Sequence, residues 1–198
     1  MTTSAPSVRP RAGALDERRL LLRATGFVGG AGLVAAAIPF VETFEPSARD
    51  LARSGPVDAE LGDLRPGQMR TVAWRGKPVW LLRRTPAMVA ALERPDPLLL
   101  DPLSHDSVQP PGCVNPTRSL KPEYLVALGV CTHLGCTPIL HLHDAQLDAQ
   151  LDAPGGYICP CHGSRFDLAG RVIRNVPAPR NLEIPPHRYT SATALRIG

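Results

Sequence analysis

Two short segments of the chain gather cysteine and histidine at spacings that are typical of metal binding. The first segment is Cys131-Thr-His-Leu-Gly-Cys136, and the second is Cys159-Pro-Cys-His-Gly-Ser164. Each segment offers one thiolate and one imidazole close together, and each carries one additional cysteine. Such a pair of groups predicts a metal site, a disulfide framework, or both.

The ligand types alone leave more than one metal open. Two sulfur and two nitrogen ligands suit a tetrahedral zinc ion. A zinc site, however, leaves the additional cysteines Cys136 and Cys161 without a role. A disulfide between them is stable outside the cytoplasm, so the compartment of the chain determines whether this disulfide forms. The fifth cysteine, Cys113, stands alone, and we expect it to be buried as a small apolar side chain.

The composition favours short elements joined by turns around an aliphatic core. The 198 residues include 22 prolines and 17 glycines, and only 5% are aromatic. The formal net charge of +4 is small, and no basic stripe is interleaved with aromatic residues. We therefore expect no nucleic-acid partner.

The N-terminal part reads as a membrane anchor. Residues 1–23 are polar and basic, and residues 24–41 contain no charged side chain. As a helix, the uncharged run would span about 27 Å, close to a bilayer core of about 30 Å. Arginines before the run predict a cytoplasmic N-terminus, with the rest of the chain outside. We expect a retained anchor, and a cleaved signal peptide or a buried helix are the alternatives.

A pair of arginines, Arg18-Arg19, is followed by three leucines. This pattern is typical of a twin-arginine signal, which directs export of a folded protein. A metal centre assembled in the cytoplasm would need that route. After the anchor we expect a flexible neck over residues 42–56 and an outer domain over residues 57–198.

The outer domain is expected to be antiparallel β, with the chemistry on loops. Residues 86–93 are expected to form a short helix, and residues 144–152 a solvated insertion. Strands are expected over residues 69–74, 79–82, 124–130, 157–159 and 171–176.

The two segments resemble the cluster-binding boxes of the Rieske proteins of cytochrome bc1 complexes. The flanking sequences resemble the same family. Asn115-Pro-Thr-Arg-Ser-Leu-Lys-Pro-Glu-Tyr precedes the first box, and Val176-Pro-Ala-Pro follows the second, where the family has a proline-rich loop over its cluster. The resemblance covers most of the chain from about residue 18.

The resemblance implies one Rieske-type [2Fe–2S] cluster in a mainly β protein. Its fold would be an antiparallel β-sandwich domain on a single N-terminal transmembrane helix. By motif position, Cys131 and Cys159 would bind one iron, while His133 and His162 would bind the other.

Other roles follow from the same match. Cys136 and Cys161 would form a disulfide, and the Ser164 hydroxyl would donate a hydrogen bond to a bridging sulfide. The sequence departs from the family at two places. Phe166 stands where high-potential members have tyrosine, and Val176 replaces a glycine before the Pro-Ala-Pro run.

The function that the resemblance implies is that of the iron–sulfur subunit of a quinol–cytochrome c oxidoreductase, not catalytic alone. It would take one electron from quinol at the cytochrome b site, with a proton coupled through a ligand histidine, and pass the electron to cytochrome c1. His162 would accept the hydrogen bond from quinol. The complex would be dimeric and sit in a bacterial inner membrane, with the Rieske domain on the periplasmic side.

Two alternatives share parts of this pattern. One is the small Rieske subunit of another periplasmic oxidoreductase, such as an arsenite oxidase. The other is a soluble Rieske electron carrier, which usually lacks both the extra cysteine pair and a membrane anchor.

Overall fold

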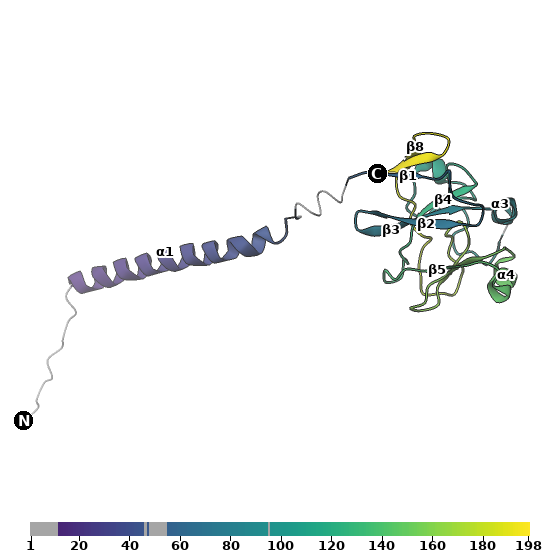
Figure 1. The fold of residues 1–198 in the computed structure, drawn as a ribbon. Coiled ribbons are helices and arrows are strands. Elements are labelled where there is room, and N and C mark those ends of the chain that lie inside the picture. The colour runs from purple at the N-terminus through teal and green to yellow at the C-terminus, as the bar shows by residue number, and fades with distance from the viewer. Residues whose placement is uncertain (1–11, 46, 48–54, 95) are drawn as a thin grey trace, which may run out of the picture. The chain divides into compact units, whose positions relative to one another are not determined.

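The computed structural model describes residues 12–45, 47, 55–94 and 96–198. The chain divides into two compact units, residues 1–49 and 50–198 (Figure 1). We call the second unit the head domain.

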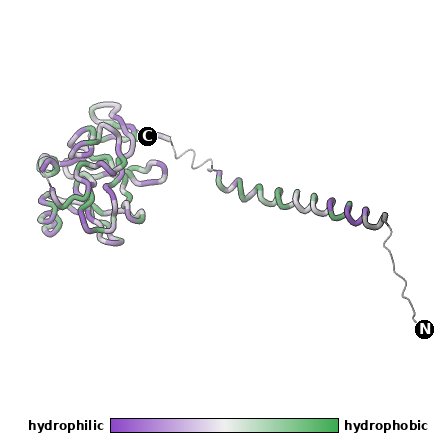
Figure 2. The backbone as a smooth tube through the Cα atoms, turned by 180° about the vertical axis from the view of Figure 1, so that it is seen from behind, coloured by the Kyte–Doolittle hydropathy of each residue, from purple (hydrophilic) through white to green (hydrophobic). Residues whose placement is uncertain are grey.

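The first unit is one long helix, α1 (Ala12–Glu42), and the predicted span 24–41 lies inside it. Within its stretch Asp16–Glu42, an 18-residue window has a mean hydropathy of 1.8 and no buried residue, so the helix is long and apolar enough to cross a membrane. Figure 2 shows the hydrophilic N-terminal turns and the more apolar remainder. The helix starts earlier than the uncharged run, so Arg18 and Arg19 lie on it. Residues 1–11 of the predicted basic segment, and 46 and 48–54 of the predicted neck, lie outside the described residues.

The head domain is mainly antiparallel β, as the sequence predicted, and it contains three sheets of three strands each. The first sheet has the order β1 (Val57–Glu60), β9 (Ala194–Ile197) and β8 (His187–Tyr189). The second has the order β2 (Met69–Trp74), β3 (Lys77–Arg83) and β4 (Tyr124–Leu128). The third has the order β5 (Ile139–His141), β6 (Gly156–Ile158) and β7 (Arg165–Phe166). In Figure 1 the first sheet lies beside the C-terminus, and β5 lies at the opposite end of the head domain.

Strands β3 and β4 of the middle sheet are buried on both faces, and they divide the interior into two cores. Alternate residues of β3 and β4, such as Leu82 and Leu125, enter one core together with both box cysteines Cys131 and Cys159. The residues between them, such as Leu81 and Val126, enter the other core against β1 and β9. The alternation arises because successive side chains of a strand point to opposite faces of the sheet, and here each face packs against another layer.

The local sequence explains how the chain enters and leaves β3. Arg75 and Gly76 both have positive φ, at 50° and 72°, which suits the two-residue turn of the β2–β3 hairpin. Helix α3 (Pro86–Glu93) follows β3, as predicted. It begins at the N-cap Thr85, whose side chain accepts a hydrogen bond from the Met88 backbone N–H.

Two expectations about elements were wrong. Residues 144–152 form helix α4 (Ala145–Leu151) rather than a solvated insertion, because Asp144 caps its N-terminus and Leu147 and Leu151 are buried on one face. Residues 171–176 form no strand; only isolated bridges from Val172 and Ile173 occur there. A further short helix, η1 (Pro111–Cys113), lies before β4.

Candidate metal centre

The first box is a closed loop that follows β4. The Cys131 N–H donates to the Cys136 carbonyl at 2.7 Å, and the Gly135 N–H donates to the Cys131 carbonyl at 3.0 Å. Gly135 has a φ of +84°, which only glycine adopts readily. These bonds hold the intervening His133 on a fixed backbone.

The second box lies between β6 and β7 and repeats this backbone pattern. The Cys159 N–H donates to the Ser164 carbonyl at 2.8 Å, and the Gly163 N–H donates to the Cys159 carbonyl at 2.9 Å. Gly163 likewise has a positive φ of +73°. Two loops of one design therefore present a cysteine near the start and a histidine near the tip of each.

A disulfide between Cys136 and Cys161 joins the two loops, as the family resemblance implied. Closing a loop of 25 residues stabilises the fold by roughly 3 kcal/mol in the chain-entropy account. The sulfurs of Cys136, Cys161 and Cys159 lie within 4.8 Å of one another. This trio is not itself a metal site, because two of its sulfurs are bonded to each other and cannot act as thiolate ligands. The disulfide instead packs against the Cys159 thiol.

The four predicted ligands come together between the loops. Cys131 and Cys159 are free thiols, each 2% exposed, and they lie within hydrogen-bonding reach of each other. The rings of His133 and His162 have centroids 4.7 Å apart and meet edge-to-face at 82°. His133 is half-buried and His162 is exposed. Two inner thiols and two outer imidazoles fit the donor set of a Rieske [2Fe–2S] cluster.

The surroundings of Cys131 act on its sulfur in opposite directions. Burial raises the pKa of the Cys131 thiol, and the neighbouring Cys159 thiol raises it further. The His133 backbone N–H and the Ser164 hydroxyl lower the pKa, because both donate hydrogen bonds to the sulfur. The site therefore already contains donors that stabilise negative charge on sulfur.

The proline-rich segment 176–180 is attached to both loops. The Thr132 hydroxyl donates to the Arg180 carbonyl at 2.6 Å, and the Ala178 N–H donates to the Ser164 hydroxyl at 3.0 Å. Each box thus supplies one side chain that fixes the segment. The sequence prediction assigned no role to Thr132. Its hydroxyl, directly between two box residues, was the one feature of the sequence that could have indicated this contact.

The departures from the family occupy packed positions. Phe166 is fully buried in the core that contains Cys131 and Cys159, whereas Val176 is half-buried and packs against that core. Cys113 is free and fully buried, which confirms the prediction for the odd cysteine.

Comparisons with known proteins agree with this geometry. The family model of the Rieske [2Fe-2S] domain matches residues 100–186. A ubiquinol-cytochrome c reductase iron-sulfur subunit of Allochromatium vinosum is 54% identical, over 91% of this chain and 87% of the relative. The proteins of the same name from Blastochloris viridis and Bradyrhizobium diazoefficiens are 39% and 35% identical; the alignments cover 91% and 100% of this chain and 92% and 100% of the relatives.

The fold, the paired loops and the donor set thus define a Rieske-type iron–sulfur protein with one [2Fe–2S] cluster and an N-terminal apolar helix that fits a single-pass membrane anchor. More narrowly, the chain belongs to the family of ubiquinol-cytochrome c reductase iron-sulfur subunits. These relatives favour neither an arsenite oxidase subunit nor a soluble carrier.

Proposed function

We propose that this chain is the electron-carrying subunit of a quinol–cytochrome c oxidoreductase. It takes one electron from a quinol bound at a cytochrome b subunit and delivers it to cytochrome c1. The observation that carries the proposal is the arrangement of the box side chains: the two thiols are buried and the His162 imidazole is exposed at the surface. The names of the close relatives support the same role.

Cys131, Cys159, His133 and His162 are proposed as the four cluster ligands, the sulfurs on the inner side and the imidazoles on the outer side. The bound cluster supplies a one-electron carrier. The two closed loops and the Cys136–Cys161 disulfide keep the ligands in place, so that little rearrangement accompanies a change of charge. The proline-rich segment and the buried thiols exclude water from the inner side.

His162 is the residue that we propose to touch the quinol. Its exposure allows its imidazole to accept a hydrogen bond from a quinol hydroxyl. A proton at this imidazole would then accompany the electron, which couples the two transfers. The head domain contributes only the His162 side of the proposed quinol site, so the chain is expected to be inactive without its partner subunits.

The placement of the chain follows from its helix. We propose that α1 remains as the anchor in a bacterial inner membrane and that the head domain lies on the periplasmic side. The arginines before the apolar run and the Arg18-Arg19 pair support this orientation. The assembled complex would be a dimer that moves protons across the membrane as it oxidises quinol.

An electron paramagnetic resonance spectrum of dithionite-reduced membranes tests the function. We expect a Rieske-type signal whose shape changes when an inhibitor of the quinol site is added. The variant His143→Gln, at an exposed histidine outside both boxes, should respond in the same way as the natural protein. A Rieske signal that ignores the inhibitor would indicate another oxidoreductase partner. A silent protein that contains zinc would exclude the cluster itself.

A further inference from the structure

The buried charges of the head domain are unbalanced. Among residues 55–94 and 96–198, four charged residues are buried, each at most 4% exposed as a whole residue: Arg84, Arg118, Arg171 and Asp167. Three positive charges against one negative leave an excess of two. Burial of an uncompensated charge is unfavourable, so this excess should have a counterpart in the working protein.

One arginine has a carboxylate partner. Arg171 and Asp167 form an ion pair whose Nε and Oδ2 atoms are 2.6 Å apart, with both side chains 5% exposed. The pair closes the turn 167–171, which directly follows β7 and the second box. The other Asp167 oxygen accepts hydrogen bonds from the Ala169 and Arg171 backbone N–H groups. Both carboxylate oxygens of Asp167 therefore have their hydrogen-bond partners within this turn.

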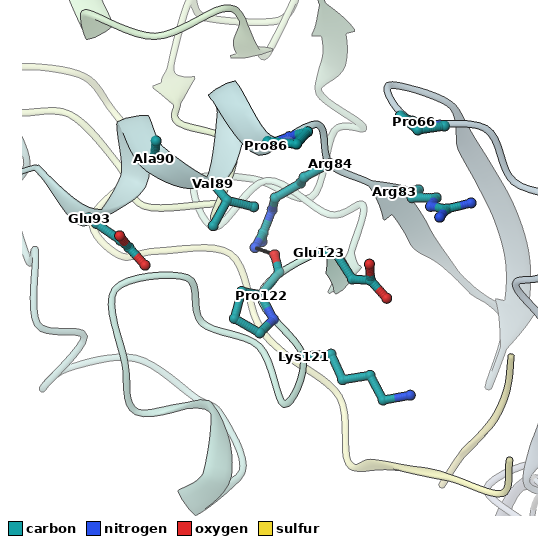
Figure 3. A pocket seen from close by; sticks show the side chains of 10 residues that line it. All are labelled: Pro66, Arg83, Arg84, Pro86, Val89, Ala90, Glu93, Lys121, Pro122 and Glu123. Atoms are coloured by element: carbon teal, nitrogen blue, oxygen red, sulfur yellow. Dashed lines mark hydrogen bonds between the residues drawn. The ribbon is translucent and has the colours of Figure 1, made fainter. Parts of the chain in front are cut away.

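Arg84 meets only carbonyl groups. Its Nε donates to Leu168 at 3.0 Å, and its two terminal nitrogens donate to Pro122 at 2.8 Å and Thr117 at 2.9 Å. Figure 3 shows the bond to Pro122 at the wall of a cavity that Glu93 also lines. Arg84 forms no ion pair with any carboxylate in the described part of the chain.

Arg118 approaches the same turn from another side. One of its terminal nitrogens lies 3.2 Å from the Ala169 carbonyl, and its remaining nitrogens donate to the Gln109 side-chain oxygen. Among the carboxylates, Asp167 acts most strongly on the Arg118 charge, and the next is Asp101. That carboxylate accepts hydrogen bonds from two backbone N–H groups and the Ser107 hydroxyl. Counting Asp101, three positive charges against two negative still leave an excess of one.

The two unpaired arginines border the core that holds the candidate ligands. Leu168 and Ala169, whose carbonyls they contact, pack in the same hydrophobic cluster as Cys131 and Cys159. The charge of Arg84 also acts on the buried Tyr157 hydroxyl, two residues before Cys159. Burial lowers the pKa of both guanidiniums to about 10, so both stay charged at neutral pH.

From this arrangement we propose that Arg84 and Arg118 tune the metal centre: their buried positive charges raise its reduction potential. They act through the electrostatic potential of their guanidinium charges and do not contact the cluster. The reduced centre carries one more negative charge than the oxidised centre, and a nearby cation in a water-poor core favours it. The inference rests on the proposed function only in that the box residues hold the cluster.

Redox titration of the full chain in membranes, followed by the cluster spectrum, tests the proposal. Arg84→Gln and Arg118→Gln remove charge, and each should shift the ratio of reduced to oxidised protein about tenfold toward oxidised at a fixed potential. That shift corresponds to a midpoint lowered by about 59 mV for one electron. Arg84→Lys and Arg118→Lys lose the same hydrogen-bond geometry but retain a basic group, whose pKa burial lowers more readily than that of arginine. Titrated on the acidic side of neutrality, where the buried ammonium is protonated, their midpoints should stay near that of the natural protein at the same pH.

A variant of opposite sign separates charge from damage. Asp167→Asn keeps the shape of the side chain but removes the one buried negative charge, so the midpoint should rise although the ion pair is lost. This variant also carries the test if a glutamine variant does not fold. Arg188→Gln removes a positive charge from an exposed residue and should change the midpoint much less, because solvent and salt screen it.

The inference would be overturned if the change in midpoint potential among the variants followed their loss of stability and not the charge of the substituted side chain. The decisive results would be lysine and glutamine variants with equal midpoints, or a lowered midpoint in Asp167→Asn. The absence of any Rieske signal in the natural protein is a different failure, because it would reject the proposed function before any midpoint is measured.

Discussion

Ser164 has one hydroxyl that serves two neighbours. Its oxygen accepts the hydrogen bond of the Ala178 N–H, and its hydroxyl lowers the pKa of the Cys131 thiol as a hydrogen-bond donor to the sulfur. In Ser164→Ala both bonds are lost, and the reduced centre loses a donor that favours its extra negative charge. We expect the midpoint potential to fall by about 40 mV, taking about 1 kcal/mol for the bond to sulfur. Ser164→Thr keeps the hydroxyl and should retain most of the potential in the same titration.

Phe166 allows the opposite experiment. Phenylalanine cannot donate a hydrogen bond, whereas a tyrosine at this position, which the family resemblance implies for high-potential members, would offer a hydroxyl for a cysteine sulfur. Phe166→Tyr should therefore raise the midpoint by about 40 mV, again for one bond of about 1 kcal/mol. The residue is fully buried, so some loss of stability from crowding is expected as well. A folded variant with an unchanged midpoint would show that the phenyl ring only packs.

Sequence spacing singled out the box residues that the structure brings together, but it gave no signal for the residues that surround and support them. The box cysteines and histidines stand a few residues apart, so a short pattern brings them together on one loop. The unpaired Arg84 and Arg118 follow no such rule. They lie in separate loops and meet only because the fold carries both to the turn 167–171. A contact of this kind has no local signal.

At the scale of the element, Thr132 ties the first loop to the proline-rich segment. Thr132→Val has nearly the same shape and removes the hydrogen bond to the Arg180 carbonyl. We expect the free energy of unfolding to fall by about 1 kcal/mol and the visible cluster absorbance to bleach faster in denaturant, because the cover over the site loosens. Thr190→Val, at an exposed position outside the loops, is the control. Equal bleaching rates in both variants would argue that the segment is held by packing alone.

The elements differ in how far their sequence determined them. The strand β2 was predicted because alternation is a local feature. The expected helix over residues 86–93 agrees with α3, whose N-cap Thr85 is equally local although the prediction did not use it. Helix α4 was missed, since its repetitive sequence suggested a low-complexity, solvated insertion, although Leu147 and Leu151 lie four residues apart on one face. Residues 171–176 look strand-like but pair only through isolated bridges, because the Arg171–Asp167 ion pair and the following loop take the chain elsewhere.

At the scale of the whole molecule, the chain joins one apolar helix to one head domain that bears the site. Neither the helix alone nor its hydropathy distinguishes an anchor from a signal sequence. Whether the cluster is inserted before or after export determines whether the head domain crosses the membrane folded or unfolded. A head domain that acquires its cluster before export has to cross the membrane folded, and the Arg18-Arg19 pair is the feature of the sequence that suits this route.

The double variant Arg18→Lys with Arg19→Lys tests that order. Both side chains remain positive, so orientation by charge is unchanged, but a receptor that reads twin arginine no longer recognises the chain. We expect protease added to intact spheroplasts to digest the head domain of the natural protein and to leave that of the variant protected. Glu42→Gln, at the far end of α1, should behave like the natural protein. Equal digestion of both head domains would mean that the chain crosses unfolded, and the cluster would then have to be assembled after export.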